Sequence, residues 1–246
     1  MLKIPFITAG FPTPDTFWDV LLELQENGAD IIEIGVPFSD PVADGPVIEA
    51  ASRQALADGI TLSWILEGLR QRKGQFTARL VLMGYMNPFL RYGFERLAKE
   101  AEELGMYGLI IPDLPLDESA PYRAIVSAHG IHLIPLIAIN TLPERMRAYA
   151  AVSTGYVYLV SVLGTTGERT DFPPELVTAL REVRKHFAIP VALGFGISNA
   201  QQLAAIPPDA HPDGIIFGSA LLRHLAEGKS AADFMRDFLL HRQECL

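Results

Sequence analysis

Eight short apolar runs of strand character alternate with amphipathic segments along the whole chain, and this alternation constrains the fold more than any other feature. The runs cover residues 4–8, 31–35, 80–84, 108–112, 132–137, 156–160, 190–194 and 214–217. Parallel strands need crossover connections long enough to hold a helix, and the intervening segments have that length. Near-continuous Ile, Leu and Val strands are typical of a sheet that helices cover on both faces.

The segments between the runs have helical periodicity. They cover residues 15–27, 47–58, 62–72, 94–104, 118–129, 143–151, 174–186, 200–206, 219–226 and 231–242. Eight strands that are each followed by a helix, within 246 residues, predict an α/β fold of the eightfold (β/α)8 TIM-barrel type. An open, doubly wound sheet is the alternative that this pattern allows. No linker or low-complexity tract divides the chain, so we expect a single domain over residues 1–246.

Charge and cysteine content narrow the class of partner. The formal net charge is −9 with only 20 Lys and Arg residues, which argues against nucleic acid or an anionic membrane as partner. The single cysteine, Cys245, excludes an internal disulfide and a Cys-based metal site. No apolar run approaches the roughly 18 residues of a membrane span, and the N-terminus does not resemble a signal peptide. We therefore expect a cytoplasmic protein.

Two carboxylates near the end of the second strand are the leading catalytic candidates. Glu33 stands alone within the apolar run 31–35, and a carboxylate is costly to bury there without a partner or a task. Strand alternation places Glu33 on the face opposite Ile34, which predicts that it points into the barrel. Asp44 lies in the following loop, where we expect it to be near solvent and ionised. A structural ion pair for Glu33 and ordinary turn chemistry for Asp44 are the alternatives.

Two glycine loops after the last two strands indicate a phosphate site. Gly194, Phe195 and Gly196 follow the seventh strand, and Gly218 and Ser219 follow the eighth at a helix start. In barrels, backbone N–H groups of these loops and the helix dipole commonly hold phosphate. Glycines needed only for tight turns are the alternative. The Gly- and Thr-rich segment 161–172 has the composition of a lid, although a long surface loop would look similar.

Other residue types argue against alternative chemistries. None of the five lysines ends a strand, so a Schiff-base aldolase is not expected. The six histidines show no paired spacing, so we expect no metal site. Aromatic residues near strand ends could line a wall for an aromatic ligand, and they are Phe6, Tyr85, Tyr158 and Phe195. The residues therefore favour carboxylate acid/base chemistry on a phosphorylated substrate.

Several motifs, in order over nearly the whole chain, resemble the tryptophan synthase alpha chain family. The most specific is EIGVPFSDPVADGP at residues 33–46. The others are PFITAG (5–10), MGYMNP (83–88), PDLP (112–115), YLVS (158–161), TG (166–167), GFGIS (194–198) and GSA (218–220). The resemblance implies a barrel lyase that cleaves indole-3-glycerol phosphate to indole and glyceraldehyde 3-phosphate.

The resemblance also implies roles for individual residues. Glu33 matches the main acid/base, and Asp44 matches the carboxylate that binds the indole N–H. The positions that match the substrate pocket are Phe6, Met83, Tyr158 and Phe195, together with Thr166 of the lid. The positions that match phosphate contacts are Gly167, Gly196, Gly218 and Ser219.

The resemblance implies a partner as well. The family forms an alpha2beta2 complex with a beta chain, which carries pyridoxal phosphate, so no cofactor is expected in this chain. Family members usually have a helix before the first strand, and this chain lacks most of it. Two other hypotheses remain open at this stage: a catalytically silent subunit that activates a partner, and another barrel enzyme, such as an isomerase, that acts on a sugar phosphate.

Overall fold

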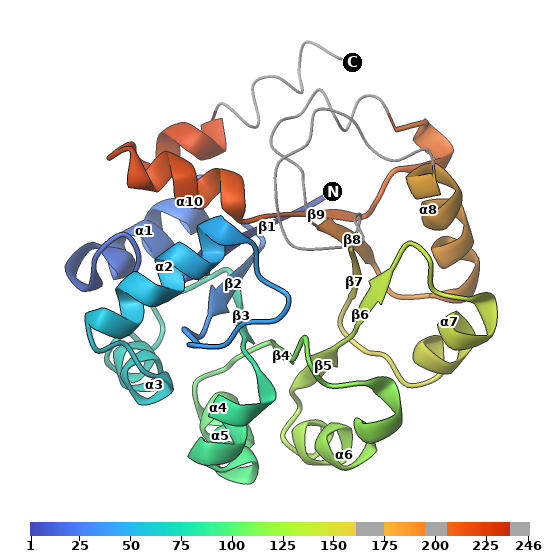
Figure 1. Ribbon diagram of the computed structural model, residues 1–246, viewed down its shortest axis with the longest axis horizontal. Helices are drawn as coiled ribbons and strands as arrows, with labels where there is room; N and C mark the ends of the chain where they lie inside the picture. Colours follow the sequence, from blue (N-terminus) through green and yellow to red (C-terminus); the bar gives the residue numbers. More distant parts are fainter. Residues whose placement is uncertain (161–174, 195–205, 237–246) are drawn as a thin grey trace.

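A single parallel sheet lies inside a ring of helices in the computed structural model, which describes residues 1–160, 175–194 and 206–236 (Figure 1). Within these residues its strands are Leu2–Thr8 (β1), Ile31–Gly35 (β2), Arg79–Met83 (β3), Gly108–Ile110 (β4), His132–Ile134 (β5), Leu136–Ala138 (β6), Val157–Val160 (β7), Val191–Gly194 (β8) and Gly214–Phe217 (β9). The strand order is β5-β4-β3-β2-β1-β9-β8-β7-β6. The predicted α/β barrel is therefore confirmed.

The predicted fifth strand is divided into two by Pro135. β5 pairs with β4, and β6 pairs with β7, so the one residue between them joins the two ends of the sheet. Proline has no N–H to donate to a ladder, which favours a break at this position. Its carbonyl still accepts a hydrogen bond from the Tyr158 N–H at 3.0 Å. The barrel thus closes at a proline, and its nine short strands correspond to eight predicted runs.

Where the structure describes the chain, helices follow the strands in nearly the predicted positions, and the helix predicted over residues 200–206 lies almost wholly outside the described residues. They are Pro14–Glu26 (α1), Pro46–Ala57 (α2), Leu62–Gln71 (α3), Met86–Tyr92 (α4), Phe94–Glu103 (α5), Ala120–Ala128 (α6), Pro143–Ala150 (α7), Glu175–His186 (α8) and Ser219–Ala226 (α10), and residues 231–236 are also helical. Short 3-10 turns occur at Leu116–Glu118 and Pro208–Ala210. No helix precedes β1 in the described part of the chain.

Helix α4 was not among the predicted helical segments. Pro88 lies in the first helical turn, where its missing N–H costs little. The N–H of Met86 at the helix start donates to the carboxylate of Asp113, at 2.9 and 3.2 Å to its two oxygens. Asp113 follows β4, so this capping contact ties two successive loops together.

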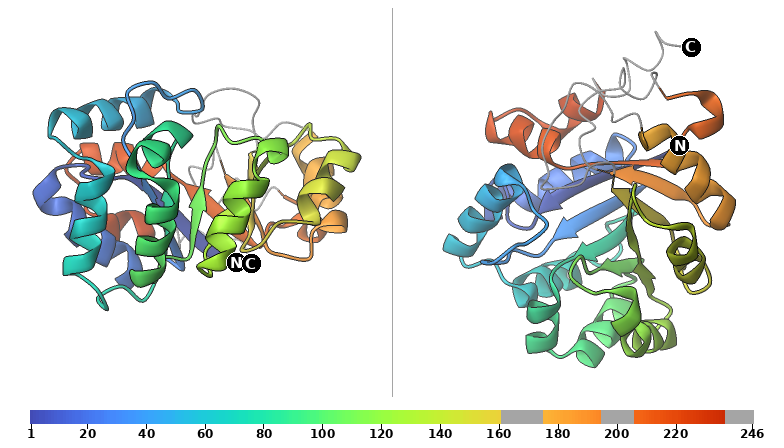
Figure 2. Two further views of the ribbon diagram at one scale, coloured as in Figure 1. Left: turned by 90° about the horizontal axis from the view of Figure 1, so that it is seen from below. Right: turned by 45° about the vertical axis from the view of Figure 1, so that its right-hand side comes forward.

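The inner face of the barrel is set by the register of its strands. Phe6 of β1, Glu33 of β2 and Val81 of β3 are aligned, so their side chains share one face. Ile34 is turned to the other face, towards the helices. The loop that follows β2 and the N-terminus lie on opposite sides of the barrel when it is seen from the side (Figure 2, left).

Both tryptophans of the chain lie in one cluster outside the barrel wall. Trp18 of α1 stacks on Trp64 of α3, with ring centroids 5.2 Å apart. The ring of Trp18 also passes so close to Gly68 that a Cβ atom there would lie 2.0 Å from it. The guanidinium of Arg72 covers Trp18 at 4.5 Å. These contacts hold α1 against α3.

Candidate active site

Glu33 points into the barrel, as strand alternation predicted. It is fully buried, and its Oε1 accepts a hydrogen bond of 2.5 Å from the hydroxyl of Tyr156. Tyr156 immediately precedes β7. β7 and β2 lie on opposite sides of the barrel: if β5 and β6 are counted as one strand, three strands lie between them in either direction around the sheet. The bond therefore crosses the interior of the barrel. The second carboxyl oxygen of Glu33, Oε2, has no hydrogen-bond partner among the described residues.

The surroundings of Glu33 favour its protonated form. Burial raises the pKa of this carboxyl from 4.5 to about 8, although the hydrogen bond from Tyr156 acts in the opposite direction. Glu33 is therefore largely protonated at neutral pH. A carboxyl group that titrates close to working pH can both deliver and accept a proton.

Asp44 lies in the loop after β2, and here the expectation of a position near solvent is wrong. Only 9% of Asp44 is exposed. Tyr85 follows β3, and its hydroxyl accepts a hydrogen bond of 3.0 Å from the Ala43 N–H. The Tyr85 ring lies 5.2 Å from that of Phe38, between their centroids. The loop after β2 is thus folded back onto Tyr85. The Pro and Gly residues of this loop predicted turns but not this contact.

The pKa of Asp44 is raised less than that of Glu33. Burial raises it from 3.8 to about 6, a hydrogen bond with Tyr85 lowers it, and the negative charge of Glu49 raises it. Asp44 therefore remains mainly ionised at neutral pH, as expected. The two carboxyl groups hold different protonation states at the same pH, which is typical of acid/base sites.

Three of the predicted pocket residues lie on the inner face of the barrel. The ring of Phe6 packs so closely on Gly35 that a Cβ atom at Gly35 would lie 2.5 Å from it. Met83 pairs with Gly35 and is buried at the end of β3. The ring of Tyr158 covers Gly194 so closely that a Cβ atom there would lie 2.2 Å from it. Burial and the negative charges of both carboxylates raise the pKa of Tyr158 well above its usual value.

The predicted phosphate site is described only in part. Gly218 immediately precedes α10 and Ser219 begins it, next to β9. A Cβ atom at Gly218 would lie 3.0 Å from the ring of Phe6, so close packing also favours glycine there. The other predicted positions lie outside the described residues, and they are Thr166, Gly167, Phe195 and Gly196, together with the whole of the proposed lid, residues 161–172.

Sequence reasoning missed two buried residues of the inner face. One is Tyr156, whose partner Glu33 is 123 positions away in the chain. Tyr156 lies two positions before Tyr158, and alternate residues of a strand share a face, so this spacing could have predicted that Tyr156 points into the barrel. The other is Thr8 at the end of β1, which is 1% exposed.

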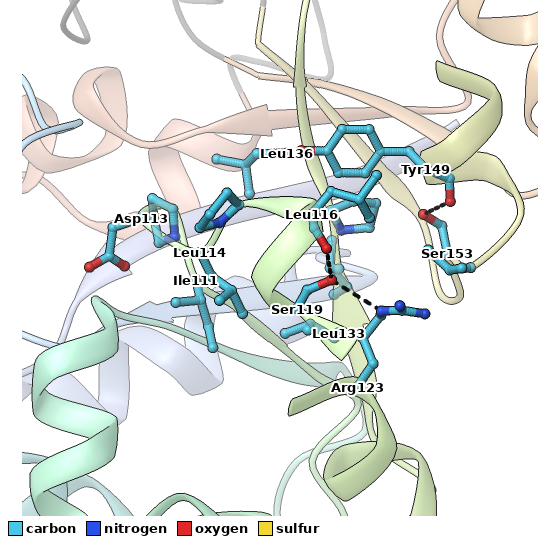
Figure 3. A pocket seen from close by; sticks show the side chains of 15 residues that line it. Ile111, Asp113, Leu114, Leu116, Ser119, Arg123, Leu133, Leu136, Tyr149 and Ser153 are labelled. Atoms are coloured by element: carbon cyan, nitrogen blue, oxygen red, sulfur yellow. Dashed lines mark hydrogen bonds between the residues drawn. The ribbon is translucent and has the colours of Figure 1, made fainter. Parts of the chain in front are cut away.

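A separate cavity of about 370 Å³ lies beside β4 and β5, between α6 and α7 (Figure 3). Its lining is mainly apolar, with Arg123, whose Nε donates to the Ser119 hydroxyl at 3.1 Å. Neither of the two candidate carboxylates lines it.

Among the residues that the structure describes, no group of three His, Cys, Asp or Glu side chains could hold a metal ion. No helix in that part of the chain is long and apolar enough to cross a membrane.

Comparison with known proteins identifies the family. The family model "Tryptophan synthase alpha chain" matches residues 2–244. A tryptophan synthase alpha chain of Desulfovibrio desulfuricans is 59% identical over 232 residues, which are 94% of this chain and 91% of the relative. One of Nitratidesulfovibrio vulgaris is 60% identical over 235 residues, with coverage of 95% and 90%.

Solved structures agree with this match. The fold resembles a chain of the tryptophan synthase a2b2 complex from Pyrococcus furiosus with a TM-score of 0.88, at 33% identity and coverage of 99% and 98%. It resembles the alpha subunit from Legionella pneumophila with a TM-score of 0.84, at 32% identity and coverage of 99% and 92%. The family model, the relatives and the solved structures agree over nearly the whole chain, and the chain belongs to the tryptophan synthase alpha chain family.

Proposed function

We propose that this chain cleaves indole-3-glycerol phosphate to indole and glyceraldehyde 3-phosphate, as the alpha subunit of a tryptophan synthase. The observation that carries the proposal is Glu33, which is fully buried, points into the barrel and has its pKa raised to about 8. Family membership supports the reaction. We also propose that the whole of residues 1–246 forms one barrel domain and that the protein is cytoplasmic.

In the proposed reaction, the protonated Glu33 donates its proton to the indole ring carbon that bears the side chain. The carboxylate so formed then accepts the proton of the adjacent side-chain hydroxyl. As that hydroxyl becomes an aldehyde, the C–C bond breaks and its electron pair returns to the ring. Asp44, which is mainly ionised, accepts a hydrogen bond from the indole N–H and stabilises the positive charge on the ring.

The remaining candidates bind the substrate. Phe6, Met83 and Tyr158 supply buried apolar surface on the inner face for the indole ring. Phe195 and the lid residue Thr166, which lie outside the described residues, are the further substrate contacts of this proposal. Backbone N–H groups at Gly218 and Ser219, with Gly167 and Gly196, hold the phosphate, and the start of α10 adds its dipole.

The proposed partner is a tryptophan synthase beta chain in an alpha2beta2 complex. Pyridoxal phosphate belongs to that partner, and the alpha chain needs no cofactor or metal ion of its own. Indole released at Glu33 is then the substrate that passes to the beta chain.

An indole-release assay on the purified chain, with and without a beta chain, tests the proposal. The wild type should release indole, and Glu33→Gln should lower the rate by about 1,000-fold or more, because the amide cannot transfer the proton. Glu103→Gln is the matched control, since Glu103 is exposed on α5. Normal turnover by Glu33→Gln would refute the role of Glu33. Inactivity under both conditions would indicate a silent subunit, and isomerase products without indole would indicate a different enzyme.

A further inference from the structure

Thr8 is a buried polar residue for which the chemistry described so far has no use. It ends β1 and is 1% exposed, and its hydroxyl has no hydrogen-bond partner among the residues that the structure describes. A buried hydroxyl without a partner costs stability, because it has lost its hydrogen bonds to water and gained none in return. Such a group suggests a ligand that completes it.

The register of β1 shows where this hydroxyl lies. Thr8 pairs with Gly35 and lies two residues beyond Phe6, which pairs with Glu33. Thr8 therefore shares the inner face with both and lies about 6–7 Å further towards the carboxyl ends of the strands. The chemistry of a barrel is located at that end.

The strand order places Thr8 between the two ends of the proposed substrate. β1 lies between β2, which carries Glu33, and β9, which leads to Gly218 and Ser219. A substrate with its scissile bond at Glu33 and its phosphate at Gly218 must therefore extend across the end of β1. The part of the molecule that spans this distance is the glycerol chain with its two hydroxyl groups.

We infer that the Thr8 hydroxyl binds the glycerol hydroxyl next to the one that Glu33 deprotonates. This inference rests on the proposed function. Two atoms of the site have no partner in the described part of the chain: Thr8 Oγ1 and Glu33 Oε2. Neighbouring hydroxyls of a diol, each with a hydrogen bond of about 2.7–2.8 Å, can satisfy both. Thr8 thereby fixes which hydroxyl meets the acid/base, and so distinguishes a glycerol phosphate chain from a plain alkyl phosphate.

Two ligands that differ only in the diol test this role. Binding of indole-3-glycerol phosphate is measured by calorimetry in Glu33→Gln, where turnover is blocked, with and without Thr8→Val. The comparison ligand is 3-(indol-3-yl)propyl phosphate, which lacks both hydroxyls. Thr8→Val should weaken binding of the diol by about 3- to 15-fold, the value of one hydrogen bond, and leave binding of the propyl ligand unchanged. Thr8→Ser keeps the hydroxyl and should bind the diol within about threefold of the parent.

Valine is nearly isosteric with threonine, so Thr8→Val should fold with a Tm no lower than that of its parent. An equal loss for both ligands would show a packing defect, and no loss for the diol would show no contact; either result overturns the inference. A wild type that releases no indole overturns the proposed function alone, because Thr8 is judged on binding. Failure of the diol to bind in Glu33→Gln would overturn both.

Discussion

Two carboxyl–tyrosine pairs occupy different regions of the molecule, and their comparison shows how surroundings assign roles. Glu33 and Tyr156 meet within the barrel, whereas Asp44 and Tyr85 meet in the loop that covers its rim. The phenol lowers the carboxyl pKa in both pairs, yet burial raises it to about 8 for Glu33 and only to about 6 for Asp44. The same pairing thus yields a proton donor in one place and an anion in the other.

The largest effect should appear when each carboxyl group is replaced by its amide. We expect Asp44→Asn to lower kcat/KM by about 100-fold, less than the loss for Glu33→Gln, because it removes a stabilising charge but leaves proton transfer intact. Indole release by both variants, measured at pH 7, gives the comparison. Equal losses would show that the two carboxyl groups do not have separate roles.

Glu33 and Asp44 should each make the stability of the fold depend on pH, over different pH ranges. A carboxyl group whose pKa is higher in the folded chain keeps its proton where the unfolded chain has lost it. Its contribution is therefore complete below the unfolded pKa and is lost as pH rises through the folded pKa. For Glu33 this window extends from 4.5 to about 8, and for Asp44 from 3.8 to about 6.

Urea unfolding between pH 4 and 9 measures this dependence. The stability of Glu33→Gln relative to wild type should rise up to pH 8, by roughly 5 kcal/mol in all. That of Asp44→Asn should rise less and stop near pH 6. A difference between Glu33→Gln and wild type that does not change with pH would mean that Glu33 is not protonated in the folded chain.

The smallest effect should come from the two phenols. If the reaction needs Glu33 protonated and Asp44 ionised, kcat/KM has a basic limb near pH 8 and an acidic limb near pH 6. Loss of a hydrogen bond to the ionised form raises a carboxyl pKa. Tyr156→Phe should therefore move the basic limb upwards by about 0.5–1 pH unit, and Tyr85→Phe should move the acidic limb upwards by a similar amount. Movement of the same limb in both variants would contradict the assignment.

The sequence predicted those parts of the fold that depend on local pattern. Apolar runs of the right length were sufficient for the strands, and alternation placed Glu33 on the inner face because a strand has a period of two. The contact of Glu33 with Tyr156 could not be predicted in this way, because it depends on how opposite sides of the barrel meet. The burial of Asp44 likewise depends on Tyr85, which lies 41 positions further along the chain.

Proline explains two local differences from expectation. Pro135 divides the fifth strand because it cannot donate to the ladder, although the apolar run continues through it. Pro88 lies in the first turn of α4, a helix that was not predicted, and the N-terminus of this helix is capped by Asp113 from the next loop. At Pro135 the missing N–H is sufficient to explain the break, whereas at Pro88 a contact from the next loop stabilises the helix start.

The location of both tryptophans between α1 and α3 has a practical consequence. Because the barrel wall separates them from the proposed indole site, their emission reports on whether this flank is folded and responds little to a ligand in the barrel. Trp18 is 5% exposed and is covered by Arg72, so its emission should shift to longer wavelength on unfolding. The chain thus contains an intrinsic optical probe of folding that is independent of its chemistry.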